Sequence, residues 1–389
     1  MNSSLLFSFP YLLLVFFLIF LSITEYAFTG YKLIKSIVQL SCLGLFLFFF
    51  GLRGFIGWDF VNYYPLFNDI PKLFSVHFIS FISKSPTETG FLLYTSFIKT
   101  ICNSYIFYNF VNTLIDLIII NIFLTRYSPN YALGFLMFLV LGGFYLETDL
   151  LRNAKSIMLF ILSIKYLLER NTAKYFIFNL IGMTFHVSSI FYLPLYFIAH
   201  RSINRNMLII LFIIGNILFL FQIEYIRIVV RNISEILGGR FTLLANQYFS
   251  NKLFSASYGL TIGYVERLIT AGLVIMLYKR LLNYNSYSVV FINLFIYYFI
   301  IFFFFGELKF ISVRVGSLFL ISYWILIPTL FEVLRLSNNK FIFLLFFFFY
   351  SVFKTYGMTN SVLFKYDNVL FSYDKFNLRK NILLQYQAK

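Results

Sequence analysis

The chain has 389 residues, of which 60% are hydrophobic and only 12% are charged, and its mean hydropathy is +0.84. Soluble domains carry roughly 25% charged residues, so this composition excludes a soluble globular domain. Lys and Arg (31) outnumber Asp and Glu (15), which gives a net charge of +16. In a membrane protein such an excess indicates basic loops that set orientation, or a site for an anion, before it indicates nucleic-acid binding.

Apolar segments of about 17 to 22 residues recur along the chain, and this is the length that crosses a hydrocarbon core of about 30 Å. They predict about ten spanning helices, at residues 5–23, 33–51, 104–124, 131–147, 150–168, 207–222, 260–278, 288–305, 310–331 and 340–356. The first segment is too long for a signal peptide and lacks a clear cleavage site, so we expect an uncleaved span. We therefore expect an all-α polytopic membrane protein in which residues 1–389 form a single integral membrane domain.

Basic residues in the short loops fall on one side of this predicted membrane, which should be the cytoplasmic side. They are Lys32, Lys35, Arg126, Arg170, Lys174, Arg201, Arg205, Lys279, Arg280, Arg335 and Lys340. The other side then holds an interfacial segment at 52–103, whose stretch at 66–82 is amphipathic. It also holds a main loop at 223–259 and a tail at 357–389.

Residues 175–199 form an apolar segment that is basic at both ends and is interrupted by FHVSS and by Pro194. A single crossing would move one of the two basic clusters to the outer side. Broken helices at membrane depth are tolerated where protein or a water-filled cavity satisfies the freed backbone groups. We therefore predict a re-entrant helical hairpin with His186 near its tip.

With this topology, charged side chains gather on the outer side of the membrane. They are Arg53, Asp59, Glu88, Arg152, Lys155, Arg227, Arg231, Arg240 and Arg314. Arginine at membrane depth is costly, so it normally faces a cavity, a partner or a phosphate. One alternative is that each arginine snorkels to headgroups or pairs with an acid such as Glu147, Asp149 or Glu307. As a set the arginines favour an anion site, because guanidinium binds phosphate through two parallel hydrogen bonds.

The sequence GLRGFIGWDFVNYYPLF at 51–67 is the most informative local feature. Glycines at 51, 54 and 57 should break the helix at the membrane edge and let the backbone turn closely. Arg53 and Asp59 are thereby offered to a cavity. The aromatic residues beside them are Trp58, Tyr63 and Tyr64. Such residues can stack on sugar faces, but they are also enriched in the aromatic belts at membrane interfaces.

Two further titratable residues lie at predicted membrane depth. His186 is either a buried histidine hydrogen-bonded to backbone, or a proton acceptor or hydrogen-bond donor towards substrate. Asp116, in the middle of a span, is either functional or paired with a Lys or Tyr of a neighbouring helix. The sequence has no Walker A loop, no GxGxxG after a strand, no HExxH and no Cys/His cluster, so ATP-driven transport has no support and neither a metal nor a cofactor is expected.

The order of these motifs resembles the EpsG/Wzy-type family of bacterial polysaccharide polymerases. The matching segments are GLRGFIGWDFVNYYPLF (51–67), TETGFLLY (87–94), the stretch from LRNAKS to FYLPL (151–195) and, more weakly, ISVRVGSLFL (311–320). The resemblance covers most of the chain. It implies a fold similar to that of C-type glycosyltransferases, which are multi-pass and use lipid-linked donors.

The resemblance also implies a reaction and a location. Such proteins lie in the bacterial inner membrane with an active site that faces the periplasm. They transfer a growing glycan from undecaprenyl pyrophosphate to the non-reducing end of a lipid-linked oligosaccharide repeat unit, and so build O-antigen, capsule or exopolysaccharide. The implied partners are these lipid-linked oligosaccharides, membrane lipids and, as a further candidate, a chain-length regulator protein.

The residues fit this chemistry because departure of a lipid pyrophosphate needs positive charge, which arginines supply without a metal. The expected pyrophosphate clamps are Arg152 and Arg314, then Arg53, with Lys155 on the same helix as Arg152. The residues expected to guide the glycan or the second lipid are Arg227, Arg231 and Arg240. The proton of the acceptor hydroxyl could go to Asp59, Glu88 or His186, and the sequence does not choose between them.

Two other functions remain open. A flippase or exporter of lipid-linked glycans would need basic residues that line a path from one face to the other, whereas these charges cluster towards the outer end. An O-antigen ligase shares much of the chemistry but moves the finished glycan to lipid A core. Ligases generally have a His-bearing outer loop, and 223–259 contains no histidine.

Overall fold

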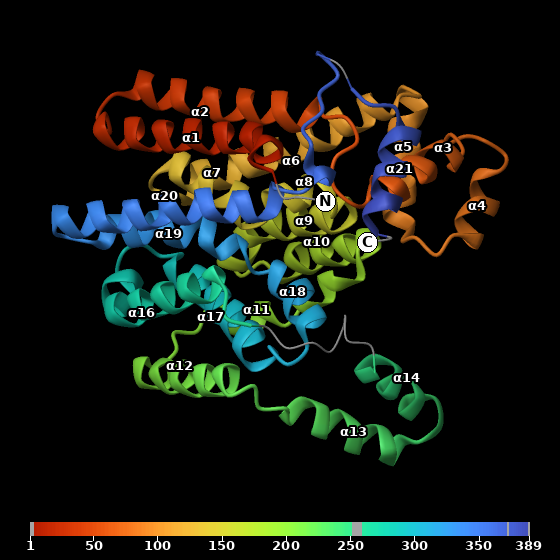
Figure 1. Ribbon diagram of the computed structural model, residues 1–389. Helices are drawn as coiled ribbons and strands as arrows, with labels where there is room; N and C mark the ends of the chain where they lie inside the picture. The colour runs from red at the N-terminus through yellow and green to blue at the C-terminus, as the bar shows by residue number, and fades with distance from the viewer. Residues whose placement is uncertain (1–3, 251–258, 372, 388–389) are drawn as a thin grey trace. The chain divides into compact units, whose positions relative to one another are not determined.

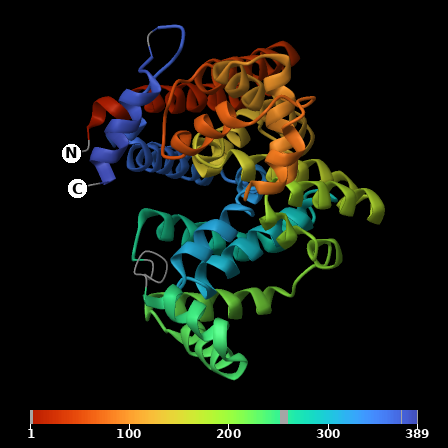
Figure 2. The ribbon, with the colours of Figure 1, turned by 90° about the vertical axis from the view of Figure 1, so that its right-hand side faces the viewer.

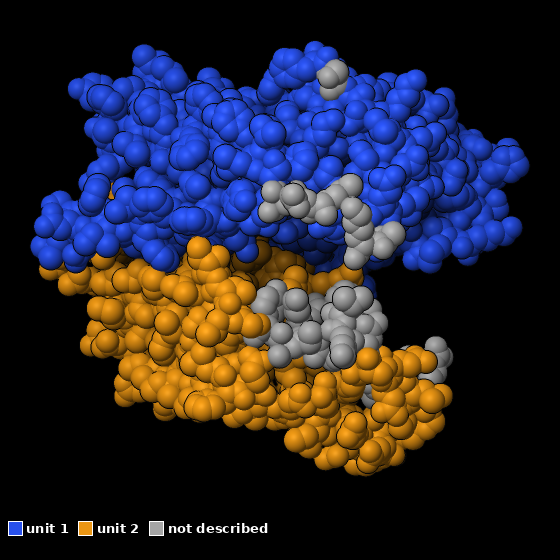
Figure 3. Space-filling model, in the orientation of Figure 1, with its two compact units in different colours: residues 1–197, 336–389 blue, residues 198–335 orange. Residues whose placement is uncertain are grey.

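A computed structural model describes residues 4–250, 259–371 and 373–387 of the chain. The structure is 78% helix, and the described residues contain no β-strand. The chain divides into two compact units, one formed by residues 1–197 with 336–389 and the other by residues 198–335 (Figure 3).

The first unit contains the N-terminal helices and the last two helices of the chain (Figure 1). Its helices are α1 (Leu5–Ala27), α2 (Lys32–Phe46), α3 (Phe60–Asp69), α4 (Phe78–Lys84), α5 (Thr89–Ile101), α6 (Tyr105–Tyr127), α7 (Tyr131–Phe138), α8 (Phe144–Thr148), α9 (Leu151–Leu168), α10 (Thr172–Phe185), α20 (Ser337–Thr359) and α21 (Phe376–Gln387). Short helical turns are η1 (Leu47–Gly51), η2 (Leu139–Gly143), η3 (Val187–Tyr192) and η4 (Val362–Phe364), and α11 (Leu195–Ile198) leads into the second unit.

Side-chain caps mark the starts of several of these helices. The hydroxyl of Ser104 accepts from the N–H of Phe107 at 3.4 Å, and the amide oxygen of Asn130 accepts from the N–H of Leu133 at 2.8 Å. Ser and Asn favour this position because their oxygens satisfy backbone donors that have no partner within the helix. The ends of the apolar runs in the sequence therefore coincide with residues that can begin a helix.

The centre of the first unit is α7, whose eight residues are all buried. It packs against α1, and α1 also packs against α20. The buried carboxylate of Glu25 on α1 accepts hydrogen bonds from the N–H groups of Tyr131 and Ala132, at 3.0 and 2.7 Å. An anion at a helix N-terminus is favourable, so this contact fixes the start of α7 against α1.

The span predicted at 131–147 is interrupted by η2. Gly142 has a φ of 129°, a conformation that glycine adopts without a steric penalty. The predicted amphipathic stretch at 66–82 is likewise two helices, α3 and α4, with a break between them. Pro71 explains the break, because the residue before a proline is pushed into an extended conformation, and Ile70 has φ −63° and ψ 128°.

Residues 172–196 fold back on themselves and form a helical hairpin. Along its open end, the Tyr175 hydroxyl donates to the Tyr192 carbonyl at 2.5 Å. Nearer the turn, a Cβ on Gly182 would lie 2.6 Å from the Ser189 hydroxyl, so the two arms touch. His186 caps the turn in extended conformation. This is the geometry of a hairpin with His186 at its tip, and its re-entry into a membrane stays a prediction.

The first loop of the chain is paired with the segment that follows α20. The N–H of Gly54 donates to the Asp367 carbonyl at 3.0 Å, and the N–H of Gly57 donates to the Leu363 carbonyl at 3.1 Å. The start of α1 and the end of α21 accordingly lie on the same side of this unit (Figure 2). Residues more than 300 positions apart thus share one backbone network.

The second unit contains α12 (Arg205–Leu220), α13 (Tyr225–Leu237), α14 (Gly239–Ser250), α16 (Ile262–Leu282), α17 (Ser288–Phe304), α18 (Lys309–Ser317) and α19 (Ile321–Val333). Most residues of α17 and α19 are buried, and these two helices pack on each other. The span predicted at 310–331 is two helices, because i→i−3 hydrogen bonds from Leu318 and Phe319 tighten the chain into a turn.

Five helical segments of the described chain are long and apolar enough to cross a membrane. They are Leu5–Ala27, Lys32–Gly51, Tyr105–Tyr127, Tyr131–Thr148 and Ser337–Thr359. The pair α12 and α13 would count as a sixth if it were one bent span. This supports a polytopic membrane protein, whereas the number of ten spans and the similarity to C-type glycosyltransferases stay predictions.

Candidate active site

The first turn of α9 carries an ion pair that links it to the start of α5. The Arg152 Nη1 lies 2.6 Å from the Glu88 Oε2. The two side chains are 36% and 23% exposed, so a ligand can approach both of them. A solvent-accessible ion pair is worth little by itself, so Arg152 can exchange its carboxylate partner for another anion at small cost.

Asp149, two residues before α9, organises the loop between η1 and α3. Its Oδ1 accepts hydrogen bonds from the N–H groups of Trp58 and Asp59, at 2.6 and 3.1 Å. Burial raises the pKa of Asp149 to about 6, against the opposing effect of these hydrogen bonds. The loop can approach this closely because Gly57 has a φ of 88° and a Cβ there would lie 2.4 Å from the carboxylate.

Tyr63 on α3 lies next to Asp149 and Arg152. Its hydroxyl lies 3.4 Å from the Asp149 carbonyl oxygen, and its ring contacts Phe91 on α5. Burial raises the pKa of Tyr63 to about 12, so its phenol is protonated at neutral pH. Arg152 also interacts with this phenol, whose oxygen accepts from the guanidinium while its proton faces the Asp149 carbonyl, so Tyr63 lies beside the ion pair.

His186 reaches the same helix turn through two polar side chains. Its Nδ1 lies 2.6 Å from the Ser188 hydroxyl, which donates to the Asn153 Oδ1 at 3.1 Å. Asn153 directly follows Arg152 on α9. Close packing holds the hairpin tip here, because a Cβ on Gly90 of α5 would lie only 2.1 Å from the Thr184 hydroxyl. The three candidate proton acceptors are Asp59, Glu88 and His186. They lie on three different elements around the start of α9.

A buried network of opposite charges lies deeper in the first unit. The Lys155 Nζ is 2.7 Å from the Asp116 Oδ1 and also donates to the Asn112 carbonyl at 3.0 Å. The Arg53 guanidinium donates to the Phe50 carbonyl at 2.7 Å. All four charged members of this network are at most 4% exposed; they are Arg53, Asp116, Glu147 and Lys155.

The hydroxyl of Thr113 connects the two halves of this network. It donates to the Glu147 Oε2 at 2.7 Å, and it lies 3.4 Å from the Arg53 Nη1. Opposite charges compensate one another in the interior, so no member of this network is a buried charge without a counter-charge. Arg53 and Lys155 are therefore engaged in the core of this unit, and their contact with substrate stays a prediction.

Tyr64 lies on a different face of α3 from Tyr63. Its ring lies 4.5 Å from that of Phe376 on α21 and 5.1 Å from that of Phe55, between ring centroids. Trp58 faces the same helix, with its ring 5.5 Å from that of Tyr386. These contacts hold α21 against the first loop. A role of Tyr64 in sugar stacking stays a prediction.

The remaining sequence-predicted arginines belong to the second unit. Arg227 pairs with Glu224 at 2.8 Å and covers the Phe249 ring at 5.4 Å. Arg231 on α13 and Arg314 on α18 are exposed. The side chain of Arg240 lies outside the described residues. That these arginines converge with Arg152 stays a prediction.

Several residues of the site were not among the candidates chosen from sequence. Asp149 was considered only as a counter-ion for arginine, whereas it binds two backbone N–H groups. Asn153 and Ser188 had no signal beyond their position next to Arg152 and His186. Arg379, buried on α21, donates to the Phe55 carbonyl at 2.7 Å and thereby supports the first loop. Within the described part of the chain, no three His, Cys, Asp or Glu side chains are grouped to hold a metal ion.

Comparison with known proteins gives one match. A family model described as the EpsG family matches residues 36–369, which is most of the chain. The matched range includes Arg53, Asp59, Glu88, Arg152 and His186. No curated protein and no solved structure matches the chain.

Proposed function

The chain belongs to the EpsG family of Wzy-like polysaccharide polymerases, and on this premise we propose that it transfers a glycan from a lipid pyrophosphate to a lipid-linked repeat unit. The donor is a glycan carried on undecaprenyl pyrophosphate, and the reaction takes place at the periplasmic face of the inner membrane. The acceptor is the non-reducing end of the incoming unit. No metal takes part in this proposal.

The accessible pair of Arg152 and Glu88 is the observation that carries the proposal. When the donor arrives, its pyrophosphate replaces the Glu88 carboxylate as the partner of Arg152. Guanidinium then stabilises the negative charge that grows on the leaving group. The exchange frees Glu88 within reach of the reacting atoms, so one event both binds the donor and releases a base.

The transfer forms one bond and breaks another. The acceptor hydroxyl oxygen forms a bond to the anomeric carbon, and the bond from that carbon to the pyrophosphate oxygen breaks. The electron pair leaves with the pyrophosphate, and the hydroxyl proton passes to Glu88. Asp59 and His186 are the alternative proton acceptors, since one lies in the loop beside Tyr63 and the other reaches Asn153 through Ser188.

The other residues beside this ion pair act by holding it in place. Tyr63 accepts from Arg152 and thereby orients the guanidinium towards the bound anion. Asp149 holds the loop that carries Asp59. Lys155 is one turn of α9 beyond Arg152, and its ion pair with Asp116 sets the rotation and depth of the helix. Arg53 and Lys155 are thus positioning residues in this mechanism.

The proposal is tested by replacing Arg152 in cells that lack the endogenous gene. Arg152→Gln should lower the rate of polymer formation about 100- to 1000-fold, as expected for loss of one preorganised donor to a developing anion. The matched control is Arg126→Gln, because Arg126 is an exposed arginine in the last turn of α6, a helix long enough to cross a membrane. Glycan length on gels and the amount of protein in the membrane are measured together.

The Arg152 variant should accumulate single repeat units while its membrane level stays that of the control. Polymer of normal length from this variant would rule out the clamp. A second variant, Glu88→Gln, separates binding from proton transfer. It should lower the turnover of saturating donor and leave donor affinity equal or higher, because the amide competes less well for Arg152 than a carboxylate does.

A further inference from the structure

The helix α13 lies where the sequence predicts a loop, and its residues follow an amphipathic pattern. Apolar residues recur at intervals of three and four; they are Ile226, Val229, Val230, Ile233, Ile236 and Leu237. Such spacing puts them on one face of a helix. The opposite face carries Arg227, Arg231 and Glu235.

Four of the six side chains in the apolar stripe of α13 have little protein against them. The side chains of Val229, Ile233, Ile236 and Leu237 are 50%, 51%, 85% and 58% exposed. In water, a stripe of this kind would be unfavourable, because burying an apolar side chain away from water lowers the free energy. The stripe therefore needs an apolar medium or partner.

The length and direction of α13 exclude a membrane crossing of its own. Its 13 residues rise about 20 Å, well short of a hydrocarbon core of about 30 Å. Its axis is bent by 83° from that of α12, which is largely apolar after its first two residues. If α12 runs across the membrane, α13 runs along the membrane surface.

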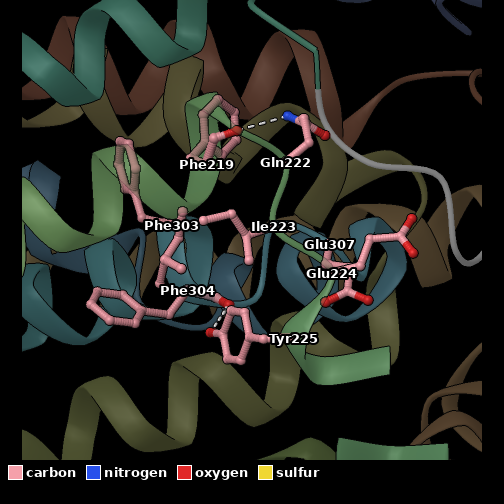
Figure 4. A pocket seen from close by; sticks show the side chains of 10 residues that line it. Phe219, Gln222, Ile223, Glu224, Tyr225, Phe303, Phe304 and Glu307 are labelled. Atoms are coloured by element: carbon pink, nitrogen blue, oxygen red, sulfur yellow. Dashed lines mark hydrogen bonds between the residues drawn. The ribbon is translucent and has the colours of Figure 1, made fainter. Parts of the chain in front are cut away.

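Side chains and backbone hold this bend in place (Figure 4). The Glu307 carboxylate accepts from the N–H groups of Ile226 and Arg227, both at 2.9 Å, and so caps the start of α13. The Tyr225 hydroxyl donates to the Phe304 carbonyl, and the Gln222 amide donates to the Phe219 carbonyl at 2.8 Å. The α17–α18 connection thus fixes the direction in which α13 leaves α12.

We propose that α13 is an interfacial helix that binds the surface of a phospholipid bilayer. Its apolar stripe enters the acyl-chain boundary, and Arg231, with Arg227, faces the phosphates of the lipid headgroups. Basic residues on the polar face and aliphatic residues on the other are the composition that such helices use. A bilayer is the occupant that suits both faces, since a soluble protein partner would not require the right-angle turn from an apolar helix.

The proposal is tested with single spin labels on the full-length protein in phospholipid vesicles, after Cys42 and Cys102 have been replaced by serine. Labels at positions 233 and 236 report on the apolar stripe, and labels at 231 and 235 on the polar face. Power-saturation measurements give the access of each label to oxygen, which concentrates in lipid, and to a water-soluble nickel chelate. Adjacent positions 235 and 236 serve as matched controls on one helix.

The expected result is higher oxygen access at 233 and 236 and higher chelate access at 231 and 235. High chelate access at all four positions would show a water-exposed loop and overturn the proposal. Low access to both reagents at 233 and 236 would show burial in protein and overturn it as well. A label at 229 repeats the measurement if one of the other variants does not fold. None of these outcomes depends on polymerase activity.

Discussion

The ion pair of Asp116 and Lys155 gives a prediction whose size follows from its surroundings. Asp116→Asn removes the carboxylate that lies 2.7 Å from the Lys155 Nζ, and both side chains are almost fully buried. Breaking one partner of a buried pair costs about 3–5 kcal/mol, because it leaves an uncompensated buried charge. Lys155 keeps the Asn112 carbonyl at 3.0 Å and the Tyr94 ring at 5.7 Å, so we expect about 3 kcal/mol.

A matched control pair lies at the other end of α9, the helix that carries Lys155. Lys165 and Glu169 form an i,i+4 pair at 3.9 Å in which both side chains are 47% exposed. Such exposed pairs contribute about 0.3–0.5 kcal/mol, so Glu169→Gln should hardly change stability. The assay is SDS titration of the purified protein in mixed micelles, followed by circular dichroism, with polymer synthesis measured on the same preparations.

A double-mutant cycle decides whether the charge pair is the cause. Asp116→Asn with Lys155→Met should cost clearly less than the sum of the two single changes, with a coupling of about 2–3 kcal/mol. The reasoning is refuted if Asp116→Asn costs no more than Glu169→Gln, or if the two changes are additive. Lower polymer synthesis in the single variant, with partial recovery in the double, would tie the pair to the position of Arg152.

Three further predictions concern the loop that faces α9. Gly57→Ala should destabilise the protein by more than about 2 kcal/mol, since a side chain at positive φ costs about 1–2 kcal/mol and the new Cβ also meets the Asp149 carboxylate. The control is Gly44→Ala, where a Cβ would have no atom within 4 Å. It should be neutral or stabilising in the same SDS titration. Because the fold raises the pKa of Asp149 from 3.8 to about 6, the native state binds the proton more tightly than the unfolded state, so this group's stabilising contribution is lost as pH rises from about 4 to about 6. Melting temperatures across this pH range should show that Asp149→Asn lacks this part of the slope, and an unchanged slope would contradict the assignment. Arg379→Gln should make the segment after α20 sensitive to protease and lower polymer synthesis, because Arg379 donates to three backbone carbonyls, whereas exposed Lys380→Gln should change neither.

Much of the helical architecture could be predicted from apolar run length, because lipid requires every backbone group in a span to be hydrogen-bonded within its own segment. The helix Tyr105–Tyr127 and the start of the chain at Leu5–Ala27 match their predicted spans within a few residues. Residues 175–199 were harder to predict, and their fold-back at His186 followed from the basic residues at both ends, whereas their re-entry into a membrane stays a prediction. The length of an apolar run cannot reveal an amphipathic helix that lies along a membrane surface. For this reason α13 was predicted as part of a loop.

The candidate site illustrates a different limit. Arg152 could be chosen because an arginine near the end of an apolar run needs a partner. Its partner could not be identified, since Glu88 is 64 positions away and the sequence offers nearer acids at 147 and 149. For Asp116 a lysine on a neighbouring helix was one of two expectations, and the structure supplies Lys155. Pairing across helices depends on rotation about each axis, which composition does not encode.

The network between the first loop and the segment after α20 has a consequence for folding during synthesis. Gly54 and Gly57 donate to carbonyls of Asp367 and Leu363, and Arg379 ties the Phe55 carbonyl to the same place. A ribosome synthesises the loop early, but its hydrogen-bonding partners emerge only after nearly all later helices have been inserted. Contacts of such long sequence separation form late because chain closure over that length is entropically costly. The loop beside Arg152 should therefore be the last part to mature, and under the proposed mechanism a half-inserted chain would not act on lipid-linked sugars.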